Sequence, residues 1–259
     1  MGALYSFGSG VVEYGIRALG VDWRVDGLEH LPATGPAIVA SNHLSYLDFA
    51  FVMLSPPRPR REMRFLARAD LFDGRFLGWF LRGVGQVPVD AHRDPLAALR
   101  HARACLDAGE LVGIHPEGTI SPSFVPRERA ATGAVRLAED ADVPLVPCAV
   151  WGAQRLLTKW RPARLPPRGI TVRVRYGEPW RPTGGSPLER TAELMRRISE
   201  LLAALQAEDA LEPGAWWVPA HLGGSAPTPQ EAEARLARQR AERRARALGE
   251  DGPGSHRSG

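Results

Sequence analysis

The sequence predicts an α/β fold: a mixed, mostly parallel sheet covered by helices, followed by a charged C-terminal helical tail. Short apolar runs, typical of buried strands, alternate along the chain with longer segments of helical periodicity. Capping residues mark the starts of several of those helices. Strands that alternate with helices in this way favour a parallel sheet with helices on its faces.

The expected elements follow from apolar runs and caps. Asp94 is an N-cap before Pro95, and Ser186 to Glu189 form a capping box with proline at the first helical position. The predicted strands cover residues 36–40, 65–67, 86–89, 111–115, 144–150 and 170–176. The predicted helices cover residues 47–54, 72–84, 95–109, 132–141 and 186–207.

Changes in composition divide the chain into three parts. Residues 1–24 form an amphipathic segment that either contacts a membrane or packs on the core. Residues 25–210 form the main domain. Residues 211–259 contain a Pro/Gly/Ala-rich linker, a charged helix that begins at a second capping box, Thr228 to Glu231, and a tail that is expected to be disordered.

The composition excludes several classes of protein. With 44% hydrophobic and 24% charged residues, the 259-residue chain is globular, and no window resembles a membrane-spanning helix or a secretory signal. Two cysteines, Cys105 and Cys148, are too few for a disulfide framework or a cysteine metal cage. The net charge of +4 suits anionic lipid, nucleic acid or a phosphorylated substrate. Lys159 is the only lysine, and this arginine-rich composition is typical of a GC-rich bacterial gene.

The first candidate site is the segment Ser41-Asn42-His43-Leu44-Ser45-Tyr46-Leu47-Asp48, directly after a buried strand. In one helix, side chains five positions apart point to different faces. His43 and Asp48 can therefore meet only if the histidine lies in the turn and the aspartate in the first turn of the helix. Asp48 would then orient the imidazole as a general base. The alternative is that His43 only packs or caps a turn.

Two further segments follow strands in the same way. His115-Pro116-Glu117-Gly118-Thr119-Ile120-Ser121 leaves a strand end, where ligands bind in open α/β sheets. The extended run from Gly85 to Arg93 ends in a guanidinium suited to a bidentate phosphate contact. Taken alone, the first segment also fits a plain turn, and Arg93 also fits a solvated surface residue.

Together and in this order, the segments resemble the glycerolipid acyltransferases of the 1-acylglycerol-3-phosphate acyltransferase family. The family blocks correspond here to Asn42–Asp48, Gly85–Arg93, Glu117–Ser121 and Val143–Pro147, and residues 65–72 resemble the segment before the second block. The resemblance spans about residues 25–180. The sequence departs from the family pattern in two places. The second block has two extra residues before Arg93, and the membrane-embedded N-terminal segment of the family is only weakly developed here.

The resemblance implies acyl transfer from an acyl-CoA or an acyl-carrier protein to the free hydroxyl of a lysophospholipid, by default 1-acylglycerol-3-phosphate, giving phosphatidate. It assigns His43 as the base and Asp48 as the residue that orients it. It implies no bound cofactor, no metal and no serine or cysteine nucleophile. The residues that it places at the bound substrate are Asn42, Ser45, Arg93, Glu117, Gly118, Thr119 and Ser121.

A lysophospholipid substrate requires access to a bilayer, so we expect peripheral attachment to an anionic membrane surface, at the cytoplasmic face of the inner membrane. Basic residues near the surface attract such a membrane. The arginines expected to do so are Arg58, Arg60, Arg61, Arg64 and Arg68. The aromatic residues Phe72, Phe76, Trp79 and Phe80 follow, at a spacing that fits membrane insertion, an acyl groove or a buried helix face.

Three other functions are weighed against this interpretation. His43, Asp48, His115 and Glu117 are plausible ligands of a metal-dependent hydrolase, although their spacing matches no metal motif. A non-catalytic lipid-binding relative is the second alternative. Nucleic-acid binding is disfavoured, because no helix-turn-helix, zinc or RNP-like pattern is present.

Overall fold

The computed structural model describes residues 3–55, 61–74, 78–79, 81–82, 86–89, 95–162 and 169–247. These form two compact units. The first contains the chain up to residue 121 together with residues 126–210, and the second contains residues 122–125 and the chain after residue 210.

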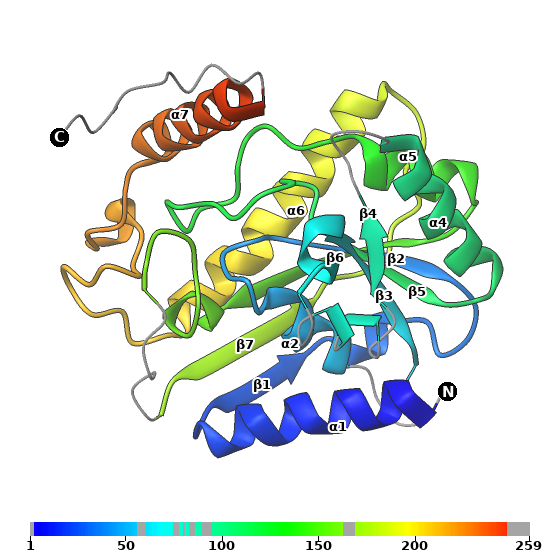
Figure 1. The fold of residues 1–259 in the computed structure, drawn as a ribbon, viewed down its shortest axis with the longest axis horizontal. Helices are drawn as coiled ribbons and strands as arrows, with labels where there is room; N and C mark the ends of the chain where they lie inside the picture. The colour runs from blue at the N-terminus through cyan, green and yellow to red at the C-terminus, as the bar shows by residue number, and fades with distance from the viewer. Residues whose placement is uncertain are drawn as a thin grey trace, which may run out of the picture. The chain divides into compact units, whose positions relative to one another are not determined.

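The first unit is built on a seven-stranded sheet of strand order β1-β7-β6-β2-β5-β3-β4 (Figure 1). All neighbouring strands are parallel except β6 and β7, which are antiparallel. The sheet is therefore mixed and mostly parallel, as predicted. The strands are β1 Asp22–Asp26, β2 Ala37–Ser41, β3 Met63–Arg68, β4 Val87–Val89, β5 Leu111–Ile114, β6 Leu145–Trp151 and β7 Thr171–Tyr176.

Helices cover both faces of this sheet (Figure 1). One core cluster packs Ile16, Phe51 and Val52 against strand residues such as Val39, and the other packs Ala102, Val135 and Leu194 against residues such as Ile38. Because Ile38 and Val39 are successive residues of β2, they point to opposite faces. The first face carries α1 Ala3–Ala18 and α2 Asp48–Leu54, and the second carries α4 Pro95–Asp107, α5 Gly133–Asp140 and α6 Pro187–Ala207. Short 3-10 helices cover Leu28–His30, Ala69–Phe72 and Ala153–Arg155.

The sequence did not predict β1. Its burial alternates along five residues at the sheet edge, and it pairs in parallel with β7. Five residues with a short polar alternation are a weak strand signal, and the pairing comes from a segment far along the chain. The boundary predicted between residues 24 and 25 falls inside this strand.

Helix α1 places part of its surface against the first core cluster. Ile16 is buried and Val12 packs beside it, whereas Val11 and Tyr14 are exposed. The helix therefore packs on the core and also presents apolar side chains to its surroundings. Within the described part of the chain, no helix is long and apolar enough to cross a membrane.

Two of the arginines expected to face lipid instead bind the protein itself. Arg61 donates to the carbonyl oxygens of Pro32, Gly35 and Gly109. Arg64 pairs with Glu62 and Glu110. The expectation is wrong for these two residues because neighbouring carbonyl and carboxylate oxygens satisfy their guanidinium groups.

The predicted aromatic segment is described only in part. Phe72 ends a 3-10 helix and is buried, while Trp79 is 53% exposed. The positions of Phe76 and Phe80, like those of Arg58 and Arg60 and the side chain of Arg68, lie outside the described residues. So do Gly85 and the segment 90–94.

The second unit joins a four-residue segment to the C-terminal part of the chain. Phe124 adopts a left-handed backbone conformation with φ 55°, and its ring packs edge-on against Trp216 at 6.0 Å. A 3-10 helix at Ala220–Leu222 precedes α7, Pro229–Ala247. Thr228 and Glu231 form the predicted capping box through reciprocal hydrogen bonds. The predicted end of the helix at Leu248 and the tail 251–259 lie outside the described residues.

Candidate active site

The site lies where the parallel strands β2, β5 and β6 end. Asn42 and His43 follow β2, His115 follows β5, and Trp151 closes β6. Parallel neighbours end at the same edge of a sheet, so these loops converge there. The topology therefore brings the first and third sequence blocks together. The hydrogen bond between His43 and Glu117 shows this, because these residues are 74 positions apart in the sequence.

His43 and Asp48 form the predicted pair. The imidazole Nδ1 lies 3.1 Å from Asp48 Oδ2, with His43 in the turn and Asp48 at the first residue of α2. A proton on Nδ1 donated to the carboxylate leaves the lone pair of Nε2 for proton transfer. The His43 side chain is 20% exposed, whereas that of Asp48 is fully buried. The imidazole is therefore accessible from solvent, whereas its carboxylate partner is not.

The turn itself holds Asp48 in place. The amides of Leu44 and Ser45 donate to its Oδ2 at 2.6 and 2.7 Å, in addition to the contact with His43. Burial raises the pKa of Asp48, and these amide hydrogen bonds lower it. A carboxylate that accepts several fixed donors has little freedom to rotate, so the orientation of His43 is determined by the backbone of its own turn.

A second histidine packs on the first. The rings of His43 and His115 are stacked at 4.1 Å with an interplanar angle of 7°, and Phe65 approaches His115 at 5.1 Å. His115 Nδ1 lies 3.0 Å from Ser41 Oγ and 3.2 Å from the Ser41 carbonyl oxygen. Its Nε2 is buried, with no hydrogen-bond partner among the described residues. The stack limits tilting of the His43 ring.

Burial lowers the pKa of His43, and the positive charge of Lys159 lowers it further. Burial also lowers the pKa of His115, and the charge of His43 lowers it further. Both effects disfavour the cationic rings. His43 is therefore neutral near pH 7, which is the state required of a general base.

Glu117 connects the loops after β2 and β5. Its Oε1 accepts from the His43 amide at 2.8 Å, and its Oε2 accepts from the Arg127 amide at 3.1 Å. The Arg127 guanidinium also donates to the Glu117 carbonyl oxygen at 2.9 Å. Burial raises the pKa of the Glu117 carboxyl, while the two amide donors lower it. Since both oxygens already have protein donors, Glu117 positions the loop that carries His43.

Asn42 and Ser45 also bind the protein backbone. Both amide atoms of Asn42 pair with Val150 of β6, at 2.9 and 2.7 Å. Ser45 Oγ donates to the Leu157 carbonyl oxygen at 2.6 Å and accepts from the Leu47 amide at 3.0 Å. Both side chains are buried. Their contacts favour a role in shaping the turn around His43.

The remaining residues of the third block differ in exposure. Gly118 is exposed and has φ 65°, a left-handed conformation that favours glycine. Thr119 Oγ1 accepts from Lys159 Nζ at 2.7 Å. The Ser121 amide donates to the His43 carbonyl oxygen at 2.8 Å, so this loop contacts His43 at both its amide and its carbonyl group. Arg93 lies outside the described residues.

Sequence reasoning missed the loop that follows β6. Tyr46 and Ser45 donate to the Leu157 carbonyl oxygen, and Thr158 Oγ1 donates to that of Leu44 at 2.7 Å. These contacts place Lys159 next to Thr119, and its charge lowers the pKa of His43. The one sequence signal was that Lys159 is the only lysine among 33 basic residues.

The cysteines are not arranged as nucleophiles. Burial raises the pKa of Cys105 to about 11, and burial places that of Cys148 well above its usual value. A thiol of this kind is protonated at neutral pH, whereas the thiolate is the reactive form.

The proposed ligands of the hydrolase alternative are engaged elsewhere. Backbone amides occupy Glu117 and Asp48 Oδ2, and the His43 and His115 rings stack face to face. In the described ranges, no cluster of three or more His, Cys, Asp or Glu residues is arranged to hold a metal ion. These contacts favour general-base chemistry by the His–Asp pair.

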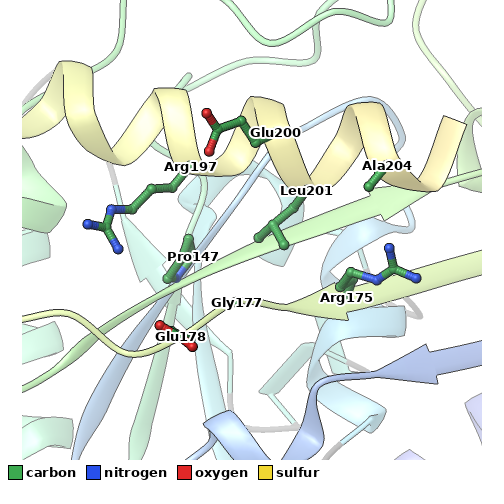
Figure 2. Close-up of a pocket in the computed structure, with 8 residues that line it drawn as sticks. All are labelled: Pro147, Arg175, Gly177, Glu178, Arg197, Glu200, Leu201 and Ala204. Carbon is green, nitrogen blue, oxygen red and sulfur yellow. The ribbon is translucent and has the colours of Figure 1, made fainter. Parts of the chain in front are cut away.

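A hollow of about 280 Å³ lies elsewhere, between α6 and the β6–β7 pair (Figure 2). None of the predicted site residues lines it. Its arginines are paired within the protein, Arg175 with Asp26 and Glu208, and Arg197 with Glu193. The lining residues are Pro147, Arg175, Gly177, Glu178, Arg197, Glu200, Leu201 and Ala204.

Fold and site together define an α/β protein with a His–Asp pair at the ends of its central parallel strands. The profile of the Acyltransferase family matches residues 22–151, half of the chain. The chain belongs to this family, as the motifs predicted.

Individual relatives agree with that assignment. The chain is 31% identical over 129 residues to the 1-acyl-sn-glycerol-3-phosphate acyltransferase of Bacillus subtilis, covering 50% of this chain and 62% of that protein. It is 30% identical over 169 residues to a mouse 1-acyl-sn-glycerol-3-phosphate acyltransferase alpha, covering 62% and 54%. The matches thus span less than two thirds of these curated relatives.

A solved structure has the same fold. The 1-acyl-sn-glycerophosphate acyltransferase PlsC of Thermotoga maritima superposes with a TM-score of 0.61 over 80% of this chain and 79% of that chain, at 24% identity.

Proposed function

We propose that this chain transfers a fatty acyl group from an acyl-CoA or acyl-carrier-protein thioester to the free hydroxyl of a lysophospholipid. The default acceptor is 1-acylglycerol-3-phosphate, and the product is then phosphatidate, a precursor in phospholipid biosynthesis. The names of the Bacillus and mouse relatives support this acceptor. The donor carrier rests on the resemblance of the motifs.

One observation carries the proposal: the imidazole of His43 is held by buried Asp48 while its own side chain remains partly exposed. In the reaction, Nε2 of His43 removes the proton from the acceptor hydroxyl as its oxygen attacks the thioester carbonyl carbon. The tetrahedral intermediate then expels the thiolate, which takes the proton back from His43. An ester and a free thiol result, and the base is regenerated.

Each residue of the site has a distinct role in this scheme. Asp48 fixes the tautomer of His43 and stabilises the imidazolium that forms during attack. His115 and Glu117 keep the ring and its loop in place. Backbone amides of the strand-end loops are the donors that we assign to the oxyanion. Arg93, Gly118, Thr119 and Ser121 are proposed to surround the acceptor headgroup.

We propose peripheral attachment to an anionic membrane, at the cytoplasmic face of the inner membrane. A lysolipid acceptor and its diacyl product both reside in a bilayer, so the site must open towards one. Among the exposed apolar side chains, we assign this contact to Val11 and Tyr14 of α1 and to Trp79.

The test is an acyl-transfer assay with purified protein. Radiolabelled acyl-CoA and acyl-carrier protein are offered against a panel of lysophospholipids, with and without a chelator. We expect labelled diacyl product, formed equally in the presence of the chelator. Folded protein that binds lipid vesicles but forms no product with any acceptor would support the non-catalytic alternative, and loss of activity with the chelator would support a metal enzyme.

A further inference from the structure

The loop after β6 places a cation in the candidate active site. Lys159 Nζ donates to Thr119 Oγ1 at 2.7 Å, and Nζ lies 5.1 Å from the centroid of the Trp160 ring. Thr119 belongs to the block that the family resemblance assigns to the acceptor. The Glu117 carboxylate and the Ser121 amide, which lie on either side of Thr119, both bind the His43 backbone, so Lys159 contacts the loop that borders His43. The charge of Lys159 also lowers the pKa of His43.

The position of this cation is determined by the loop around the base. Leu157 accepts hydrogen bonds from Ser45 and Tyr46, and Thr158 donates to Leu44. These contacts attach the residues just before Lys159 to the turn that carries His43. Three hydrogen bonds thus fix the chain next to Lys159 to the His43 turn, and a fourth, from Lys159 Nζ to Thr119, fixes the ammonium group.

The chemical structures of the acyl acceptor and the acyl donor indicate which of their phosphates a cation near His43 would bind. In 1-acylglycerol-3-phosphate, the phosphate is attached to the carbon next to the one that bears the reacting hydroxyl. In an acyl-CoA or an acyl-carrier protein, the phosphates lie at the far end of the pantetheine arm from the thioester. A cation beside the base is thus within reach of the acceptor phosphate when the hydroxyl approaches His43.

We propose that Lys159, together with Thr119, binds the phosphate of the acyl acceptor and so selects phosphorylated lysolipids over neutral ones. The inference rests on the proposed acyl transfer. An ammonium group is a suitable phosphate ligand because it donates up to three hydrogen bonds as a compact charge. The hydroxyl of Thr119 can turn its proton towards the phosphate while it accepts from Lys159.

The test compares Lys159→Met, which keeps the length of the side chain but removes its charge, with Lys159→Arg. We expect Lys159→Met to raise the KM for 1-acylglycerol-3-phosphate by about 10- to 100-fold, the effect of losing a charge-assisted hydrogen bond. The KM for the acyl donor should stay unchanged, and Lys159→Arg should recover most of the loss. Arg136→Met, which removes an exposed charge from α5, is the matched control and should change neither KM.

A second measurement does not depend on turnover. In the full-length His43→Ala variant, acetylation of Lys159 by an amine-reactive ester is followed by peptide mass spectrometry, which separates the only lysine from the N-terminal amine. We expect 1-acylglycerol-3-phosphate to slow the acetylation, and monoacylglycerol or acyl-CoA to leave it unchanged.

The outcomes separate this inference from the proposed function. An unchanged acceptor KM in Lys159→Met overturns the inference, and so does a raised donor KM, which would place the donor phosphate at this residue. If the wild-type protein transfers no acyl group, the proposed function fails, and the protection measurement alone then decides whether Lys159 binds the phosphorylated lipid. Equal acetylation with and without that lipid would overturn the inference in either case.

Discussion

Two loops border His43, and they differ in how the sequence reveals them. The turn from Asn42 to Asp48 contains the proposed base, the carboxylate that contacts it and two backbone donors within seven residues, so this arrangement is visible as a local sequence pattern. The loop at Leu157–Lys159 reaches the same base through contacts such as Ser45 to Leu157, which are 112 positions apart. A motif can be recognised in the sequence only where the residues of a site are close along the chain. The place of the second loop beside His43 is determined by the sheet topology and leaves no such local pattern.

The first prediction tests the local turn. Asp48→Asn keeps the shape of the side chain but replaces the carboxylate that orients His43. We expect kcat to fall by about 10²- to 10⁴-fold, the usual contribution of a positioned general base. Steady-state kinetics measure this effect, and circular dichroism checks that the variant is folded. Wild-type kcat in a folded Asp48→Asn protein would mean that the pair is only structural.

The second prediction concerns the connection between the loops after β2 and β5. In Glu117→Gln one oxygen can still accept from the His43 amide, but the new NH₂ group faces the Arg127 amide, a second donor. Leaving a buried donor without an acceptor costs about 1–3 kcal/mol, which we expect as a lower free energy of unfolding. Denaturant titration measures it. An unchanged free energy would show that Glu117 does not hold the loops together.

The third prediction uses pH to compare the two loops. The titratable groups around His43 are Asp48, His115, Glu117 and Lys159, and of these the Lys159 charge lowers the pKa of His43. His43 must be neutral and Asp48 ionised for general-base catalysis, so the acid limb of kcat/KM reports the titration of this pair; burial lowers the pKa of the imidazole and raises that of the carboxyl. Lys159→Met removes a positive charge that disfavours the imidazolium form of His43, so we expect the pKa of His43 to rise.

The acid limb of Lys159→Met should therefore move to higher pH than in the wild type. The pH profile of kcat/KM measures the shift, and Arg136→Met serves as the control that loses an equal charge elsewhere. A limb that moves to lower pH, or stays in place, would show that the second loop does not act on the base.

The smallest effect is expected far from both loops. Helix α7 buries Ala232 and Leu236 and otherwise carries many charged residues. Removal of residues 225–259 should leave kcat unchanged and lower thermal stability slightly. The truncation keeps Phe124 and Trp216 together in the second unit. A large loss of kcat would mean that catalysis needs the C-terminal helix.

Much of the fold was predictable because apolar runs and caps are local signals. Every described strand except β1 lies within two residues of its predicted position, whereas β1 is a short edge strand recognised only through its pairing with β7. In the site, the contact of His43 with Asp48 followed from spacing and strand-turn-helix order. Three features could not be predicted from the sequence, because each depends on the relative positions of different strand ends. They are the stack of His115 on His43, the contacts of both Glu117 oxygens and the position of Lys159.

The sharpest measurement compares the two stacked histidines, His43→Ala and His115→Phe, in the acyl-transfer assay. Phenylalanine keeps an aromatic ring against His43 but cannot accept a proton. If His43 is the base, His43→Ala should abolish product formation with every acceptor, whereas His115→Phe should retain turnover. Product formed by His43→Ala, or activity lost only in His115→Phe, would contradict general-base catalysis by His43.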